Sequence, residues 1–177
     1  MKQGVITKNT DILLATSTKH DVQTAHNMKK LLQNKKANFN YDILDKYLAG
    51  LSLLGLEVKS LKNSHGSIAE SYIIERGGEL FLVGAHIPPY QPGNTPENYD
   101  PYRPRKLIIT RNEINEIKKK LNEQGLTMVP IVILLEKNLL KIELGIARGK
   151  KKHDKRSTLK KRAVDRDIER ELKRRSR

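Results

Sequence analysis

The sequence predicts a mostly β protein: a small antiparallel barrel flanked by α-helices and followed by a basic C-terminal tail. Several short segments alternate apolar and polar residues, which is the pattern of half-buried strands. One stretch, residues 110–125, carries a clear helical signature. Closing the strands into a barrel buries their apolar faces without leaving exposed edges. Basic residues crowd the end of the chain, which predicts the tail.

The first half of the body supplies several of the expected strands. Strand-like patterning occurs in three segments, residues 39–44, 72–74 and 80–83. The last two flank the pair Gly77-Gly78, which is typical of a β-hairpin turn. Residues 51–60 are apolar and then alternating, and Gly50 and Gly55 indicate bends or close backbone contacts.

The second half begins with an irregular segment. Residues 88–104 hold most of the seven prolines, which predicts a long irregular loop. Thr110 precedes Glu113 by three residues, a capping-box pattern, and apolar residues then mark one face until Gly125. A helix is therefore expected between Thr110 and Gly125. Two more strands are predicted, at residues 127–135 and 140–147.

The charge is concentrated at the C-terminus. The 177 residues carry a formal net charge of +15, from 35 Lys and Arg and 20 Asp and Glu. Residues 148–177 hold 15 basic and 5 acidic residues, which leaves a net charge of only +5 for residues 1–147. A nearly balanced body with a cationic tail indicates a polyanionic partner, with nucleic acid the leading candidate.

The chain divides into three parts on these grounds. Residues 1–33 are polar and mixed and predict a poorly ordered N-terminal extension, with a short helix around residues 22–32 as the alternative. Met28 is a candidate internal start. Residues 34–148 form the predicted barrel. Residues 149–177 form a tail that we expect to be disordered when free and helical when bound to a polyanion, because its apolar stripe is thin.

Several classes of protein are disfavoured by composition. The absence of cysteine excludes disulfides, thiolate metal sites and a cysteine nucleophile, and it fits a cytoplasmic protein. No apolar run reaches the roughly 20 residues that a membrane-spanning helix needs. The five histidines lack metal-ligand spacing, and no phosphate-binding glycine loop occurs. We therefore expect a monomer without enzyme activity, metal, cofactor or membrane attachment.

Two basic features point to RNA. One follows the proline-rich loop and comprises Arg103, Arg105 and Lys106. Three tyrosines lie near it in the sequence, namely Tyr90, Tyr99 and Tyr102. Cations neutralise phosphate and aromatic faces stack on unpaired bases, although a solvated loop with its aromatics folded onto the barrel is the alternative. The other feature is residues 149–156, where five of eight positions are cationic.

Five short motifs carry a family resemblance. They occur in order at residues 34–37, 49–62, 84–90, 100–107 and 147–156. Each is weak alone, but five in the right order and spacing form a specific signal. On these motifs the chain resembles the SsrA-binding protein family, also called small protein B, of bacterial trans-translation. The resemblance covers about residues 34–162.

The resemblance implies an oligonucleotide-binding (OB-like) antiparallel β-barrel with flanking α-helices and no chemistry of its own. The family binds the tRNA-like domain of transfer-messenger RNA (tmRNA) and carries it to ribosomes stalled on messages without a stop codon. Its tail enters the decoding centre of the small subunit and the empty mRNA channel. Elongation factor Tu is a further candidate partner through the tmRNA complex. A general single-strand-binding barrel and an RNA-cleaving enzyme remain alternatives.

Site residues follow from the resemblance by position. The implied tmRNA-binding residues are Glu57, Lys59, Arg103, Arg105, Lys106, Ile108, Thr110 and Lys141. The implied ribosome-binding residues are Gly149, Lys150, His153, Asp154, Lys155 and Arg156. For Glu57 and Thr110 an internal role, as a barrel hydrogen bond or a helix cap, is the alternative. Leu48 stands where the family usually has Glu, so a polar contact there is lost or supplied by Asp45 or Glu57.

Overall fold

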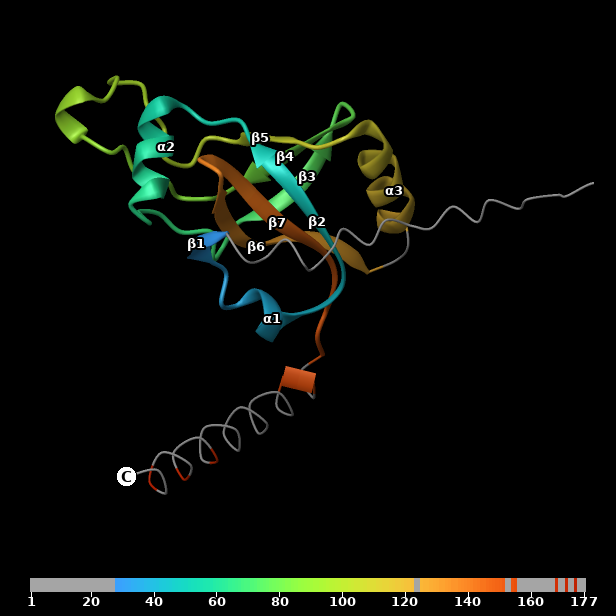
Figure 1. Cartoon of the computed structure of the whole chain (residues 1–177). Coiled ribbons are helices and arrows are strands. Elements are labelled where there is room, and N and C mark those ends of the chain that lie inside the picture. The colour runs from blue at the N-terminus through green and yellow to red at the C-terminus, as the bar shows by residue number, and fades with distance from the viewer. Residues whose placement is uncertain are drawn as a thin grey trace, which may run out of the picture.

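The computed structural model describes residues 28–122, 125–151, 154, 155, 168, 171 and 174. Its strands are β1 (Lys29–Gln33), β2 (Tyr41–Leu51), β3 (Tyr72–Arg76), β4 (Glu79–Val83), β5 (Arg105–Ile108), β6 (Leu126–Glu136) and β7 (Leu139–Gly149). They form one antiparallel sheet in the order β1-β6-β3-β4-β5-β2-β7. A further pairing of β6 with β7 closes β2 to β7 into a barrel (Figure 1). The predicted mostly β barrel is confirmed.

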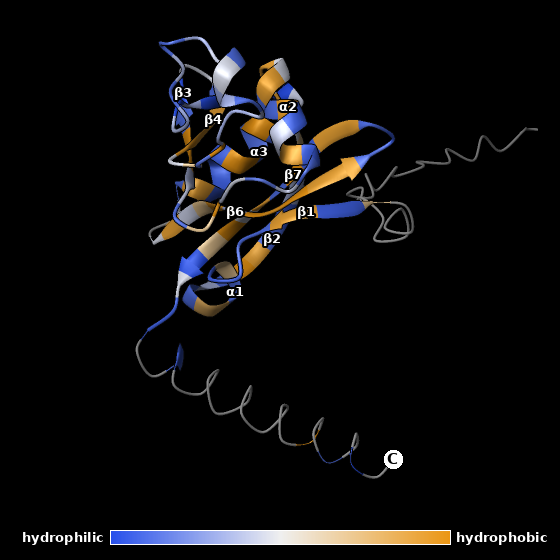
Figure 2. Ribbon diagram, turned by 90° about the vertical axis from the view of Figure 1, so that its left-hand side faces the viewer, coloured by the Kyte–Doolittle hydropathy of each residue, from blue (hydrophilic) through white to orange (hydrophobic). Residues whose placement is uncertain are grey.

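The neighbouring strands β6 and β7 show how the barrel core is built. Alternate residues of β7 are buried in the core, namely Leu140, Ile142, Leu144 and Ile146. Lys141 and Glu143, which lie between them, are only partly buried and lie on the outside. Figure 2 colours both strands largely as hydrophobic. Full burial of each aliphatic side chain stabilises the fold by about 1.5–3 kcal/mol.

Three helices flank the barrel in the described body: α1 (Ala37–Asn40), α2 (Gly55–Lys62) and α3 (Arg111–Leu121). The predicted capping box begins α3. Thr110 Oγ1 accepts the N–H of Glu113 at 3.4 Å, and Glu113 Oε2 accepts the N–H of Thr110 at 3.1 Å. Ile114 and Ile117 are then buried against the barrel. No helix in the described part of the chain is both long and apolar enough to span a membrane.

The N-terminal boundary at residue 33 is wrong. Residues 29–33 form β1, which pairs with β6, and Leu31 and Leu32 belong to the barrel core. The alternative of a helix reaching residue 32 fails for the same reason, while residues 22–27 lie outside the described residues. A five-residue strand carries too little alternation to be recognised from the local sequence. Its partner strand, β6, lies about 100 residues away, so the pairing itself leaves no local signal.

Two further elements differ from their sequence patterns. The strand predicted from Phe39 begins at Tyr41, because residues 37–40 form the short helix α1. Gly55 does not mark a bend within a strand but begins α2, whose buried residues Glu57, Ser60 and Leu61 share one helical face. The hairpin β3–β4, the irregular loop 88–104 and the β6–β7 pair agree with prediction; the loop includes a 3₁₀ turn at Pro92–Asn94.

Gly66 is a position where only glycine fits, and it provides a test of the fold. Its φ is +130°, and a Cβ there would lie 2.7 Å from the carbonyl oxygen of His86. Gly66→Ala should lower the free energy of unfolding by about 1–3 kcal/mol. Gly55→Ala is the control, since a Cβ at this first residue of α2 meets nothing within 4 Å. Urea unfolding measures both, and equal effects would contradict this account.

Candidate nucleic-acid interface

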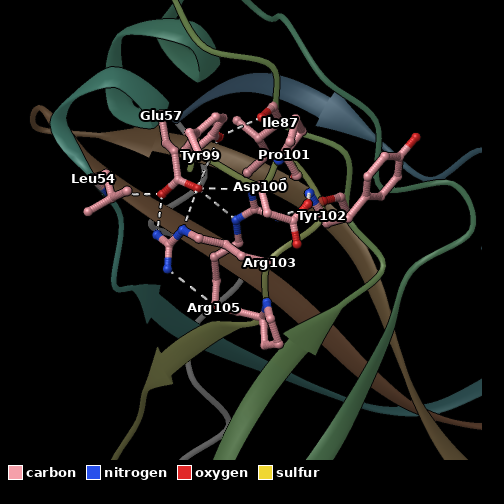
Figure 3. Close-up of polar contacts among 11 residues, drawn as sticks. Leu54, Glu57, Ile87, Tyr99, Asp100, Pro101, Tyr102, Arg103 and Arg105 are labelled. Carbon is pink, nitrogen blue, oxygen red and sulfur yellow. Dashed lines mark hydrogen bonds and ion pairs between the residues drawn. The ribbon is translucent and has the colours of Figure 1, made fainter. Parts of the chain in front are cut away.

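A buried carboxylate lies beneath the basic cluster that the sequence singled out (Figure 3). Glu57, in the first turn of α2, is fully buried. Its Oε2 accepts the backbone N–H of Leu54 at 2.8 Å. Its Oε1 accepts Nε of Arg103 at 2.9 Å, and Nε and Nη2 of Arg105 at 3.0 and 2.8 Å. Arg103 Nη2 also pairs with Oε2, so the carboxylate binds two guanidinium groups.

The same network holds the proline-rich loop in place. Arg105 is fully buried and donates through Nη2 to the carbonyl of Pro101 at 2.7 Å and through Nη1 to that of Ala85. The hydroxyl of Tyr99 donates to the carbonyl of Ile87 at 2.7 Å and lies 3.3 Å from Glu57 Oε1. These contacts join α2, β5 and both ends of the loop 88–104. The loop is therefore irregular but anchored.

Opposing effects act on the pKa of Glu57. Burial removes water from the carboxylate and by itself raises its pKa. Hydrogen bonds from Arg103, the Leu54 N–H and Arg105 act in the opposite direction, and the net result is a pKa below the ordinary value of 4.5. Glu57 is therefore ionised at neutral pH and acts as the counter-charge of the two arginines.

Two of the residues implied to bind tmRNA are buried. The side chains of Glu57 and Arg105 are both 0% exposed, so neither is accessible to an RNA molecule in this structure. For Glu57 the geometry supports the internal alternative. Arg105 lies on β5 with Leu107 on the inner face, whereas Lys106 and Ile108 alternate outward. A count of cations in the sequence does not distinguish the two faces of a strand.

The outward face of three strands brings several implied RNA-binding residues together. In the sheet register Gly50 of β2 pairs with Ile108 of β5 on one side and with Lys141 of β7 on the other. Ile108 is 61% exposed, which is unusual for an isoleucine. A Cβ on Gly50 would lie 3.3 Å from the Cβ of Ile108, so glycine permits this close approach.

These residues line a groove of about 350 Å³ at one end of the barrel. Its other lining residues are Leu51, Leu53, Val58, Asn138, Leu139 and Leu140. Lys62 donates to Asn138 Oδ1 at 3.1 Å beside the groove, and Lys59 is exposed on the same helix, α2. An apolar surface edged by ammonium groups suits a base and its phosphates. Leu53, Val58 and Leu139 are not among the residues that the resemblance implied, because strand register and the placement of α2 bring them here.

Two cations of this face have acidic partners. Lys106 pairs with Glu79 at the surface, and Lys141 pairs with Glu136, where both side chains are partly buried. The exposed pair of Lys106 contributes only about 0–1 kcal/mol, so an arriving phosphate can replace Glu79 at little cost. Thr110 caps α3, which supports its internal alternative, yet it remains exposed beside this face.

The three tyrosines near the basic cluster separate in the structure. Tyr99 is held inside the network of Glu57. Tyr102 is 57% exposed, and its ring centroid lies 4.9 Å from that of His86. Tyr90 is also exposed at the surface of the loop. Two aromatic faces thus remain accessible for stacking, while the third stabilises the loop.

Leu48 packs outside the main barrel core, against the cluster of buried β6 residues Ile131, Val132 and Leu134. Asp45 pairs with Lys120 at 3.1 Å, and Glu57 is buried, so neither carboxylate takes over an outward polar contact at Leu48. In the described part of the chain, no group of three or more His, Asp or Glu side chains is arranged to hold a metal ion.

The implied ribosome-binding residues begin where the barrel ends. Gly149 is the last residue of β7 and pairs with Tyr41. Lys150 follows, and Asp154 and Lys155 are helical. His153 and Arg156 lie outside the described residues.

Comparison with known proteins identifies the family. The family described as SmpB protein matches residues 31–174. The chain belongs to the SmpB protein family. An SsrA-binding protein of Mesoplasma florum is 46% identical over 140 residues, which cover 79% of this chain and 94% of that relative. One from Synechococcus sp. (strain JA-2-3B'a(2-13)) is 42% identical over 149 residues, covering 84% and 97%.

A solved structure supports the fold of this SmpB-family chain. It is described as "tmRNA-SmpB: a journey to the center of the bacterial ribosome". The match has a TM-score of 0.58 at 38% sequence identity and covers 70% of this chain and 87% of that one. The expected family and barrel are therefore confirmed.

The buried ion pairs of Glu57 make a testable contribution to stability. Glu57→Gln leaves the guanidinium of Arg105 buried without a counter-charge, so the free energy of unfolding should fall by about 3–5 kcal/mol. Glu79→Gln is the matched control, because its pair with Lys106 is exposed and contributes about 0–1 kcal/mol. Urea denaturation compares the two, and similar losses would refute the role assigned to Glu57.

The lowered pKa of Glu57 predicts a pH dependence. Stability from a carboxylate with a depressed folded pKa is present above its unfolded pKa of 4.5 and is lost as pH falls through the folded value. Between about pH 6 and about pH 3, the wild type should therefore lose more unfolding free energy than Glu57→Gln. Denaturation curves across this range measure the difference. Parallel losses in both proteins would count against it.

Proposed function

We propose that this protein is an RNA-binding adaptor of trans-translation. It binds the tRNA-like domain of tmRNA through the barrel and delivers it to ribosomes stalled on mRNA that lacks a stop codon. Its tail occupies the decoding centre and the empty mRNA channel. The observation that carries this proposal is membership of the SmpB protein family over residues 31–174, together with a structural neighbour described as tmRNA-SmpB in the bacterial ribosome.

The outward face of β5, β2 and β7 is the part of the barrel that we assign to tmRNA. Lys59, Lys106 and Lys141 offer ammonium groups, and Ile108 offers an exposed apolar surface. Arg103 retains 29% side-chain exposure beside its ion pair with Glu57, so it can also meet a phosphate. Glu57 and Arg105 act beneath this face as supports of the loop. Thr110 contributes from the start of α3.

The two parts of the charge then serve two attachments. The body has a modest charge of +5 and reads a folded RNA through the shape and polarity of one face. Residues 148–177, which comprise Arg148 and the tail, carry a charge of +10, which suits ribosomal RNA. In this assignment the protein catalyses no reaction, needs no cofactor, and works as a monomer in the cytoplasm. Elongation factor Tu meets it only through the tmRNA complex.

Removal of the tail tests this division. A protein ending at Arg148 keeps the outward face and should bind the tRNA-like domain within about threefold of the full chain, while tagging on stalled ribosomes is abolished. Gel-shift titration and a reconstituted tagging assay measure the two properties.

A point variant changes the outward face and leaves the tail intact. Ile108→Asp places a negative charge on the outward face and should weaken tmRNA binding in the full chain. Ile74→Asp is the control, since Ile74 is an exposed isoleucine on β3.

If truncation at Arg148 removed RNA binding and tagging equally, the division of labour would be wrong. Tight binding of unrelated single strands would instead favour a general single-strand-binding protein.

A further inference from the structure

The backbone of Tyr102 is held in a closed turn, although its side chain is exposed. The N–H of Arg103 donates to the carbonyl of Asp100 at 3.2 Å, which closes a turn with Pro101 and Tyr102 at its centre. The Asp100 side chain accepts the N–H of Tyr102 at 2.8 Å. Aspartate is favoured at the first position of such a turn and proline at the second. Local sequence and hydrogen bonds therefore fix the backbone from which the Tyr102 side chain projects.

This turn is itself attached to the segment that carries His86. The carbonyl of Pro101 accepts the N–H of Ile87 at 3.1 Å. His86, the residue before Ile87, exchanges two backbone hydrogen bonds with Ser67, at 2.8 and 2.9 Å. The backbones of Tyr102 and His86 are thus both fixed, and they are fixed relative to each other.

The rings of His86 and Tyr102 form an aromatic surface on the loop. Their centroids lie 4.9 Å apart, and their planes are tilted by 42°. In Figure 3 the ring of Tyr102 points away from the carboxylate of Glu57. Tyr102 is 57% exposed, so its contact with His86 covers only part of the ring. A ring that is held in advance loses little conformational freedom on binding, which suits stacking on an unpaired base.

We propose that Tyr102 stacks on an unpaired base of the tRNA-like domain of tmRNA, and that His86 is a positioning residue for its ring. This inference rests on the proposed function and adds a contact outside the groove. Helix α2 contacts both sites, because its Val58 lines the groove and its Glu57 pairs with Arg103. Arg103 directly follows Tyr102 and is partly exposed, so it offers a cation to the phosphate beside the stacked base.

The dependence of affinity on salt separates stacking from phosphate contacts. Tyr102→Leu keeps an apolar side chain but removes the flat ring face, so the affinity of the full chain for the tRNA-like domain should fall about five- to thirtyfold. This loss should be equal at low and high salt, because stacking releases no counterions. Lys106→Met should instead reduce the salt slope by about one. Tyr72→Leu is the matched control, since Tyr72 is 49% exposed on β3, and it should bind like the wild type.

Fluorescence provides a direct probe of the contact, because the chain has no tryptophan. Tyr102→Trp keeps an aromatic face, and its emission should be quenched when the isolated tRNA-like domain binds. Tyr72→Trp, in the same titration, should not be quenched. This probe tests the contact independently of any effect of Tyr102→Leu on stability. Quenching of Tyr102→Trp by ribosomes but not by the isolated domain would overturn the assignment to tmRNA.

The role of His86 is tested by rescue. His86→Ala removes the ring beside Tyr102 and should lower the affinity about two- to tenfold, whereas His86→Phe keeps a ring and should restore it. Equal losses in both variants would overturn the positioning role. Equal affinities of wild type, Tyr102→Leu and Tyr72→Leu would overturn the stacking role. Failure of the wild type to bind the domain would refute the proposed function instead, so the two failures are distinguishable.

Discussion

The architecture of the proposed RNA-binding end depends on one buried charge. Glu57 is excluded from water, and an ionised carboxylate there is tolerable only because two guanidinium groups and a backbone N–H surround it. Those donors come from the loop, from β5 and from the residue before α2. Satisfying one carboxylate therefore fixes the helix, the strand and the proline-rich loop relative to each other. The exposed residues around them are therefore also held in fixed positions.

Strand alternation then separates support from contact. Arg105 and Leu107 point into the barrel, whereas Lys106 and Ile108 point out of it, within four consecutive residues. Closure of the ring brings β2 between β5 and β7, so that Gly50 lies between Ile108 and Lys141. The residues of the basic cluster thus lie in two layers in the structure. The inner layer holds the loop, and the outer layer is accessible to a phosphate or a base.

The charge of the protein is likewise divided between two parts of the molecule. In the body the cations of the outward face have acidic partners, such as Glu79 for Lys106 and Glu136 for Lys141. Such pairs screen non-specific attraction and leave selection to geometry. The tail is far more cationic, and Lys150, which follows β7, donates to two carbonyls of α1. The proposed function therefore places specific recognition and strong attraction in different parts of one short chain.

Local periodicity, turn chemistry and ordered motifs were enough to predict the mostly β class, the hairpin at Gly77-Gly78, the helix capped by Thr110, the basic tail and the family. They missed β1 and α2, whose signals are short and whose partners are distant. The folded arrangement of the strands and α2 was needed to show that Glu57 and Arg105 are internal and that Ile108 and Lys141 share one face. Burial and strand register arise from contacts between residues far apart in the chain, and local patterns do not encode those contacts.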